Sequence, residues 1–319
     1  TASYNTAVGY AALTSNTTGS VNTAVGGTAL YANTTASDNT AVGYLALYAN
    51  TTGANNVAIG VAALDANTTG ALNTGIGAYA LSSNTTATNN TAVGQGSLAA
   101  TTTGGDNSAL GDRALLANTT GAQNVAVGRM ALQANTTAND NTAVGNYSLF
   151  YNTTGVNNTA VGRSVLEANT TGINNTSVGM QSLISNTTGT EHAALGFQAL
   201  RSNTTGSSNV AVGNEALENN TTAGDNTAVG TKSLRANTTG ANNTSVGTLS
   251  LIANTTGARN TAVGKNALSL TQTGNDSIGI GEYAQSTSAS ASGQCTLGGS
   301  SISNLRCNDT SISSLSDSR

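Results

Sequence analysis

The sequence predicts an all-β fold, a parallel β-solenoid (β-roll) whose coils are each one seventeen-residue repeat. The pentapeptide Asn-Thr-Ala-Val-Gly at residues 5–9 returns at this fixed period without an insertion, and degenerate copies reach residues 294–298, which makes eighteen starts. Helical repeats need about 33 residues or more, so this unit is too short for a helix pair. Turn-forming Asn, Thr and Gly flank two short segments, "NTAVG" and "xAL". We therefore expect two short strands and two turns in each coil.

Counted from its first Asn, the repeat has the consensus N-T-A-V-G-x-x-A-L-x-x-N-T-T-G-x-x. Position 4 is always Val, Ile or Leu, as in Val246, and position 9 is Leu in sixteen consecutive repeats, as in Leu251. We expect both positions to line the core. Position 5 is Gly in all eighteen copies, as in Gly247, which indicates a backbone conformation or a contact that excludes other residues.

Positions 3 and 8 hold small residues, with Val165 as the exception at position 8. Alternation along a strand places positions 2 and 4 on one face and positions 3 and 5 on the other. Two large apolar side chains per coil are few, because they must offset the cost of ordering the whole coil. We therefore expect identical chains to pack along the small face as a homotrimeric rod roughly 85 Å long. Two chains, or a single thin solenoid, remain open.

Two polar columns run through the repeats. Position 12 is Asn in fourteen of sixteen repeats, as in Asn237, and position 14 is Thr in all sixteen, as in Thr239. Position 1 is Asn in fifteen of eighteen, as in Asn243. The triplet Asn237-Thr238-Thr239 is an acceptor for N-glycosylation, but the column at position 1 is equally regular without being one. We predict ladders of stacked Asn side chains and turns, with glycosylation as the alternative.

The domain organisation follows from where this regularity holds. Residues 1–281 form the regular repeat, residues 282–315 an irregular Ser-rich C-terminal cap, and residues 316–319 the start of a further segment. The chain opens in mid-repeat, with Thr1 in the register of Thr18. We therefore expect further repeats or other domains to precede residue 1 in the parent protein.

The final residues, Ser314-Leu-Ser-Asp-Ser-Arg319, resemble the junction in phage tail fibres and tailspikes that carry an intramolecular chaperone of the peptidase S74 type. This resemblance implies a chaperone that trimerises the fibre and then cuts itself off, so that residues 316–319 are the start of the removed chaperone domain. It also implies that Ser316 is the nucleophile, followed by Asp317 and Arg319 of the motif, with cleavage after Leu315. A Lys would be the base of a Ser-Lys pair, and that Lys is absent from this chain. The alternative is a tail that is simply rich in Ser and Asp.

The strand segments have a second resemblance. "NVAIG" at residues 56–60 and "NVAVG" at residues 124–128 are similar to the repeats of YadA-type heads in trimeric autotransporter adhesins. That similarity implies a left-handed parallel β-roll that associates as a trimer. The repeat unit of that family is somewhat shorter than the one in this chain.

Chemistry-bearing residues are sparse. His192 is the only His, and it replaces Asn at position 1, so we predict that it substitutes in the ladder. Cys295 and Cys307 lie 12 apart without a nearby His, which does not make a zinc site. A disulfide and two free thiols both remain open. Four Asp residues precede the position 1 Asn or lie beside it, and we expect solvated turns there rather than a calcium site: Asp38, Asp106, Asp140 and Asp225.

Composition excludes several partners. Net charge is −4, and charged residues make up 8 % of the chain against the ~25 % of typical soluble domains. Nothing basic suggests a nucleic acid partner, and no apolar run of ~18 residues predicts membrane insertion. We expect no cofactor, no metal site and no enzymatic activity, because strict regularity leaves no cluster of carboxylates.

These observations predict a structural role. We expect the shaft of a phage tail fibre or tailspike, extracellular on the virion, which positions a receptor-binding region against the host-cell surface. Its partners would be identical chains and, through adjoining regions, a host receptor. The alternative is the head or stalk of a trimeric adhesin on a bacterial cell surface.

Overall fold

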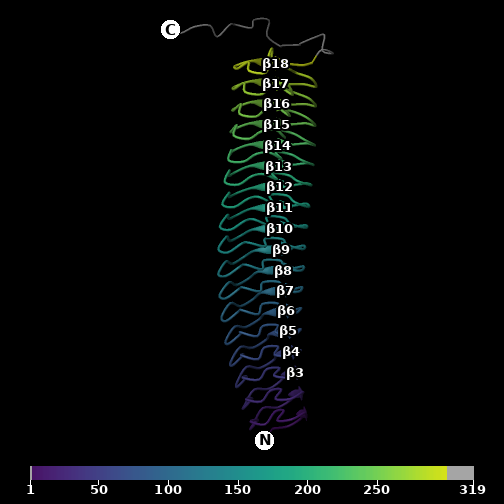
Figure 1. Ribbon diagram of the computed structural model, residues 1–319, viewed down its shortest axis with the longest axis vertical. Coiled ribbons are helices and arrows are strands. Elements are labelled where there is room, and N and C mark those ends of the chain that lie inside the picture. Colours follow the sequence, from purple (N-terminus) through teal and green to yellow (C-terminus); the bar gives the residue numbers. More distant parts are fainter. Residues whose placement is uncertain (1, 300–319) are drawn as a thin grey trace, which may run out of the picture.

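A computed structural model describes residues 2–299, and within them the chain winds into a single β-solenoid (Figure 1). Each turn of the solenoid contributes one strand of three residues, and each strand pairs in parallel with the next along the chain, from β1–β2 to β17–β18. The pairing is offset by one repeat throughout, so Thr227 lies beside Thr244 and Ala228 beside Ser245. The strands are β1 (Thr6–Val8), β2 (Thr23–Val25), β3 (Thr40–Val42), β4 (Val57–Ile59), β5 (Thr74–Ile76), β6 (Thr91–Val93), β7 (Ser108–Leu110), β8 (Val125–Val127), β9 (Thr142–Val144), β10 (Thr159–Val161), β11 (Thr176–Val178), β12 (Ala193–Leu195), β13 (Val210–Val212), β14 (Thr227–Val229), β15 (Thr244–Val246), β16 (Thr261–Val263), β17 (Ile278–Ile280) and β18 (Cys295–Leu297).

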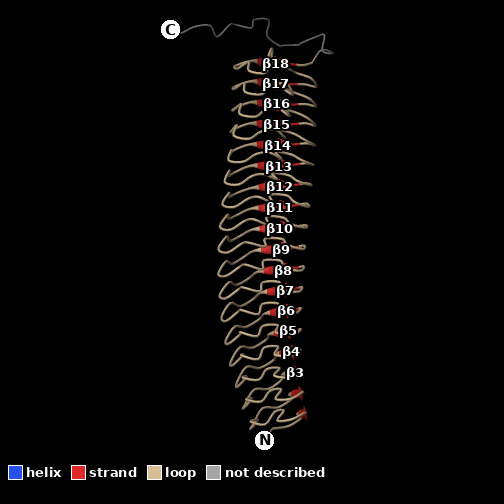
Figure 2. Ribbon diagram, viewed as in Figure 1, coloured by secondary structure: helices blue, strands red, loops and turns tan. Residues whose placement is uncertain are grey.

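The predicted second strand of each coil is wrong. The "xAL" segment is a turn, and the strands occupy only one side of every coil (Figure 2). Positions 7 and 9 there adopt left-handed backbone conformations, as at Leu249 (φ 59°) and Leu251 (φ 46°). The Leu249 amide donates to Thr231 O in the preceding coil at 3.0 Å, and the Leu251 amide donates to Ala267 O in the following coil at 2.9 Å. Alternating left-handed residues therefore let the turn bond to both neighbouring coils without forming a strand.

The core of the solenoid is a narrow column of small side chains and one Leu per coil. Positions 3, 8 and 9 point inward, as at Ala228, Ser250 and Leu251, which are all 0 % exposed. The expectation that position 9 lies in the core is confirmed. The expectation for position 4 is wrong, because Val246 is 37 % exposed and Val8 is 58 % exposed. A three-residue strand directs only its middle side chain inward, and the first and third residues therefore face out.

The small residues consequently have a different role from the predicted one. They do not form an outer face for packing between chains, because each coil buries them inside its own cross-section. The Leu at position 9 already fills most of the interior, so only Ala, Ser or Gly fits opposite it. Where Gly279 occupies position 3, an added Cβ would lie 2.6 Å from Leu268 Cγ. Small side chains are thus required for the two sides of one coil to approach each other.

Candidate functional surfaces

The Asn column at position 1 connects each coil to the next and also spans the coil interior. The main-chain N–H of Asn260 donates to Asn243 Oδ1 at 3.0 Å, and the main-chain N–H of Asn243 donates to Asn226 Oδ1 at 2.9 Å. Asn243 Nδ2 donates across the coil to Gly257 O at 2.9 Å. The side chain is 0 % exposed. Its hydrogen bonds offset the cost of burying a polar amide.

In the second column, at position 12, the bonds between coils join side chain to side chain, and each Asn also bonds to the main chain of its own turn. Asn237 Nδ2 donates to Asn220 Oδ1 and to Gly240 O, both at 2.9 Å, while Asn237 Oδ1 accepts from Asn254 Nδ2 at 2.9 Å. Asn237 is also 0 % exposed. Both hydrogens of its amide are used, so a glycan on Nδ2 would replace one of these two buried donors and would have no route to solvent. In the folded rod, the Asn of this triplet is therefore part of the buried ladder and is not accessible for glycosylation.

A third ladder lies one residue later, and sequence reasoning did not identify it. Thr238 Oγ1 donates to Thr255 O in the next coil at 3.0 Å, and the same bond recurs along the rod, for example from Thr51 to Thr68 at 3.1 Å. Thr239, which the sequence singled out, is exposed, and its Oγ1 has no protein partner among residues 2–299. The signal for this ladder was present, because Thr is also frequent at position 13.

The ladder at position 12 is interrupted where Thr replaces Asn. Asn84 Oδ1 and Asn254 Oδ1 are buried without a hydrogen-bond partner, and each lies directly before a coil that carries Thr in the column, at Thr101 and Thr271. Thr101 still accepts from the next coil, because Asn118 Nδ2 lies 3.3 Å from its Oγ1. A hydroxyl can therefore continue the ladder in one direction only.

Replacing Thr101 by Asn should stabilise the rod by about 1–3 kcal/mol, the usual cost of an unsatisfied buried polar group. The new Nδ2 would donate to Asn84 Oδ1 and to Gly104 O, as its counterparts do in neighbouring coils. The midpoint of urea unfolding and the exchange rates of amide hydrogens in the coils at residues 73–118 would report the gain.

The matched control is Asn169→Thr, which introduces the same interruption into an intact part of the ladder. It removes the donor to Asn152 Oδ1, at present 2.9 Å away, and should destabilise the rod by a similar amount. If Thr101→Asn and Asn169→Thr shift the unfolding midpoint in the same direction, the ladder does not control stability.

His192 stands in the column at position 1, as its sequence position predicts. Its ring is 2 % exposed, with Nε2 2.7 Å from Gly206 O and Nδ1 3.2 Å from the amide of Asn209. Nε2 therefore carries the hydrogen and donates to Gly206 O, while Nδ1 accepts. Burial lowers the pKa of His192 from 6.5 to about 4, although the bonds to Gly206 and Asn209 act in the opposite direction. The neutral ring replaces the amide of an Asn.

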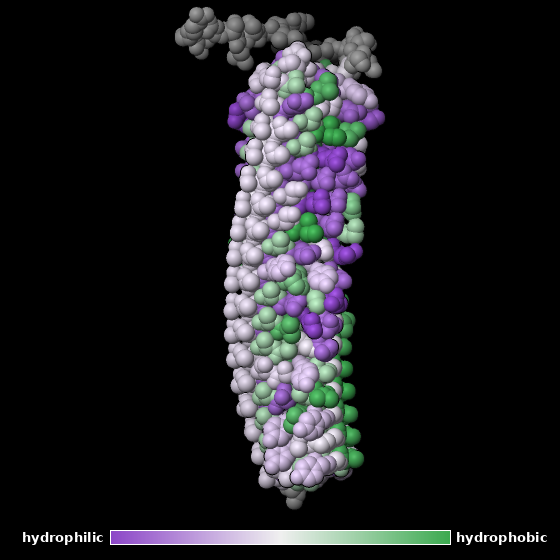
Figure 3. Space-filling view, in the orientation of Figure 1, coloured by the Kyte–Doolittle hydropathy of each residue, from purple (hydrophilic) through white to green (hydrophobic). Residues whose placement is uncertain are grey.

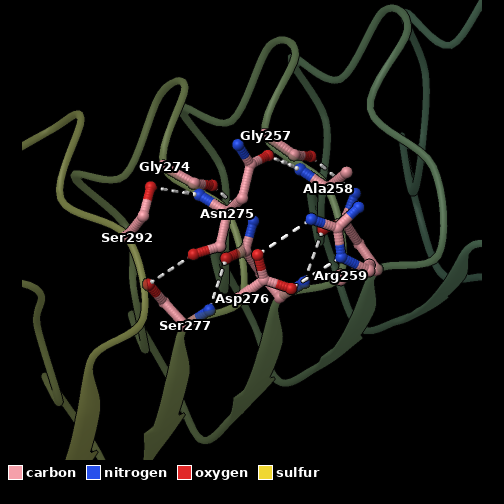
Figure 4. A network of polar contacts seen from close by, with 10 residues as sticks. Gly257, Ala258, Arg259, Gly274, Asn275, Asp276, Ser277 and Ser292 are labelled. Carbon is pink, nitrogen blue, oxygen red and sulfur yellow. Dashed lines mark hydrogen bonds and ion pairs between the residues drawn. The ribbon is translucent and has the colours of Figure 1, made fainter. Parts of the chain in front are cut away.

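Charged side chains lie outside these columns and pair between neighbouring coils. Arg235 Nε lies 2.7 Å from Glu218 Oε2 and 3.0 Å from Glu215 Oε2. Near the C-terminal end, Arg259 donates to both carboxylate oxygens of Asp276 at 2.6 Å and 2.8 Å (Figure 4). This pair lowers the pKa of the Asp276 carboxyl. The Arg259–Asp276 pair is exposed on both sides, and exposed ion pairs contribute little to stability.

The four Asp residues singled out in the sequence all occupy position 17, with φ of 59–60°. This left-handed conformation favours Asp and Asn, which explains why they recur there. All four side chains are exposed: Asp38, Asp106, Asp140 and Asp225. Within residues 2–299, no three His, Cys, Asp or Glu side chains gather closely enough to hold a metal ion.

The outer face of the sheet is an uncharged strip that runs the length of the solenoid. We call it the strand face and define it by the first and third residues of β1–β18, which are Thr, Ser, Val, Ile, Leu, Ala or Cys throughout. Its apolar members range from partly exposed, as at Val161, to well exposed, as at Leu195 (51 %) and Leu297 (52 %). In the view of Figure 3, a column of hydrophobic side chains follows the right edge of the N-terminal half, where Figure 2 draws the strands.

The strand face is hollowed over three of its strands. An apolar depression of about 300 Å³ lies over β11–β13, lined by Thr176, Val178, Ala193, Ala194, Leu195 and Val212. It forms because Ala193 stands at position 2, where Thr or Val is usual. Ala193 lies between Thr176 and Val210 of the two neighbouring strands, and its smaller side chain leaves space between theirs.

The cleavage motif predicted at the chain end, Ser316, Asp317 and Arg319, lies outside the described residues, as does Cys307. Cys295 is a free, exposed thiol at the start of β18. Among residues 2–299, no helix has the length and apolar character needed to cross a membrane. Neither the protein-family models nor the curated proteins searched contain a match to this chain.

Proposed function

We propose that this chain is the shaft of a phage tail fibre or tailspike, in which three copies surround one axis. The observation that carries the proposal is the unbroken stack of eighteen one-strand coils, which extends for roughly 85 Å at the spacing of paired strands. The rod keeps the same cross-section along this length because the same columns repeat in every coil. Its role is mechanical, since a stiff rod sets the distance over which a receptor-binding region reaches and displays several copies of that region together.

Two further features support the proposal. The terminal Ser-Asp-Ser-Arg resembles the start of the chaperone that trimerises such fibres. The repeated columns of each coil are occupied by Asn side chains that satisfy the backbone and by packing residues, while the variable positions carry the charges that pair between coils. The repeated residues of such a rod stabilise its own fold. The rod serves as a structural, non-enzymatic element of an extracellular virion.

The adhesin alternative is supported by the similarity of the "NVAIG" segments to YadA-type heads. Immunogold labelling separates the two functions. Antibodies raised against residues 2–299 should label tail fibres of virions in electron micrographs of the source material. Labelling of bacterial envelopes instead, with bare virions, would refute the shaft and support the adhesin.

A further inference from the structure

We infer that the strand face is the surface through which copies of this chain pack against one another. This inference rests on the proposed multi-chain rod and deepens it by naming the contact surface. It replaces the small-residue positions of the sequence-based prediction, which each coil buries within itself. The occupant is a second copy of the same strand face.

The strand face carries no charge, in contrast to the turns at positions 6, 7, 10 and 17, where the charged residues stand. None of the outward residues of the eighteen strands is Asp, Glu, Lys or Arg. The charged residues instead stand on the turns, as Glu215 and Arg235 do. Depletion of charge at the centre of a patch distinguishes interface cores from ordinary surface. A solvated strand would be expected to carry polar, often charged, residues on its outer side.

The size of the strand face fits a stable contact. Three residues make a strip roughly 10 Å wide, and eighteen strands extend it to about 80 Å, which gives about 800 Å² per chain. A specific protein–protein interface buries about 800 Å² from each partner. Within this face, the third residue of every strand is Val, Ile or Leu, so an apolar stripe runs along its whole length.

The hollow over β11–β13 makes the strand face uneven, so a side chain of the partner copy can fit into it. Its lining side chains are apolar apart from Thr176. An apolar side chain of the facing copy can enter where Ala193 leaves space, and Leu195 projects beside it at 51 % exposure. At this place a projecting Leu stands beside a recessed Ala, and faces that interdigitate pack large residues opposite small ones in this way.

The first experiment measures the mass of the wild-type rod and of two matched triple variants by light scattering. We expect the wild type, and the variant with charges on exposed turns, to have a mass of several times the 31.3 kDa chain. We expect the strand-face variant to fall to a single chain, because carboxylates buried at the contact would be unpaired. The strand-face variant is Val127→Asp, Val161→Asp and Leu195→Asp, and the control is Thr120→Asp, Thr154→Asp and Thr188→Asp.

The second experiment tests the same contact without the charged substitutions, which could prevent folding. In a background with Cys295→Ser and Cys307→Ser, a single Val161→Cys is compared with Thr154→Cys for its rate of reaction with a soluble maleimide. We expect the thiol at position 161 to react at least tenfold more slowly. Equal rates for the two thiols, or an unchanged mass for the folded strand-face variant, would overturn the inference.

The outcomes separate this inference from the proposed function. A wild type of three chains with a freely reactive thiol at position 161 overturns the strand face as the contact and leaves the trimeric shaft standing. A wild type of two chains with that thiol protected supports the strand face and contradicts the trimer. A wild type with the mass of one chain overturns both.

Discussion

Gly247→Ala should destabilise the coils around residue 247 by about 3 kcal/mol or more. The backbone of Gly247 has φ +137°, a conformation that residues with a Cβ rarely adopt and that costs them about 1–3 kcal/mol. The added methyl would also lie 2.5 Å from Gly264 O and 2.6 Å from Gly264 C in the next coil. These are backbone atoms held by the ladder, so relief requires the two coils to separate. Forced overpacking adds about 1–3 kcal/mol.

The measurement is amide hydrogen exchange along the rod, together with the thermal midpoint. Solenoid repeats contact mainly their neighbours, so protection should be lost first in the coils on either side of residue 247. Gly27→Ala is the control, because Gly27 lies outside the left-handed region and its nearest neighbour is the movable side chain of Tyr44 at 3.3 Å. Full protection around Ala at position 247 would show that the Gly column is not required.

The sequence predicted the solenoid and its period because stacking makes every coil obey the same constraints. A residue such as Asn243 hydrogen-bonds to both the preceding coil and the following coil, so two separate contacts restrict which residue can stand there. Columns of Asn, Leu and Gly are therefore visible in one sequence alone. The substitution of His192 for Asn in the ladder was also predicted from its column, and the structure shows that its ring supplies the donor and the acceptor that the column needs.

The direction in which the strand faces could not be obtained in the same way. Alternation groups positions 2 and 4 correctly, but it does not say which group is inside. We expected the larger side chain, as at Val246, to be buried, yet Ser245 at position 3 is 0 % exposed and Val246 is 37 % exposed. The interior is already filled by Leu251 from the opposite side of the coil. The space left inside the coil therefore determines which strand residues face inward, and the larger Val246 faces outward.

The left-handed turn could not be predicted from the sequence, because the conformation is unfavourable for an isolated Leu. A Leu in the left-handed region costs about 1–2 kcal/mol, so propensity argues against the conformation that Leu251 adopts with φ 46°. Full burial of a Leu side chain is worth about 1.5–3 kcal/mol, and the turn also gives its amide a 2.9 Å bond to Ala267 O. Packing and stacking outweigh the local preference, which no short sequence window reveals.

His192 should make the rod sensitive to acid, and His192→Asn should remove that sensitivity. The pKa of His192 is lowered to about 4 in the folded chain, against 6.5 for the free side chain. Between these two values the unfolded chain binds more protons than the folded chain, so stability is retained above pH 6.5 and is lost as pH falls toward 4. The shift corresponds to a loss of about 3 kcal/mol across that window.

The comparison to measure is urea unfolding of the wild type and of His192→Asn at a series of pH values from about 7.5 to 4, chosen to cover the two pKa values. Other carboxyl groups, such as that of Asp65, whose pKa is raised by burial, are present in both proteins and cancel in the difference. Asn restores the amide that its column carries elsewhere, so the variant should fold as the same ladder. The stability difference between the two proteins should widen steadily as pH falls. A difference that stays constant over the series would mean that His192 is not held neutral, and that its place in the ladder depends on the shape of the ring alone.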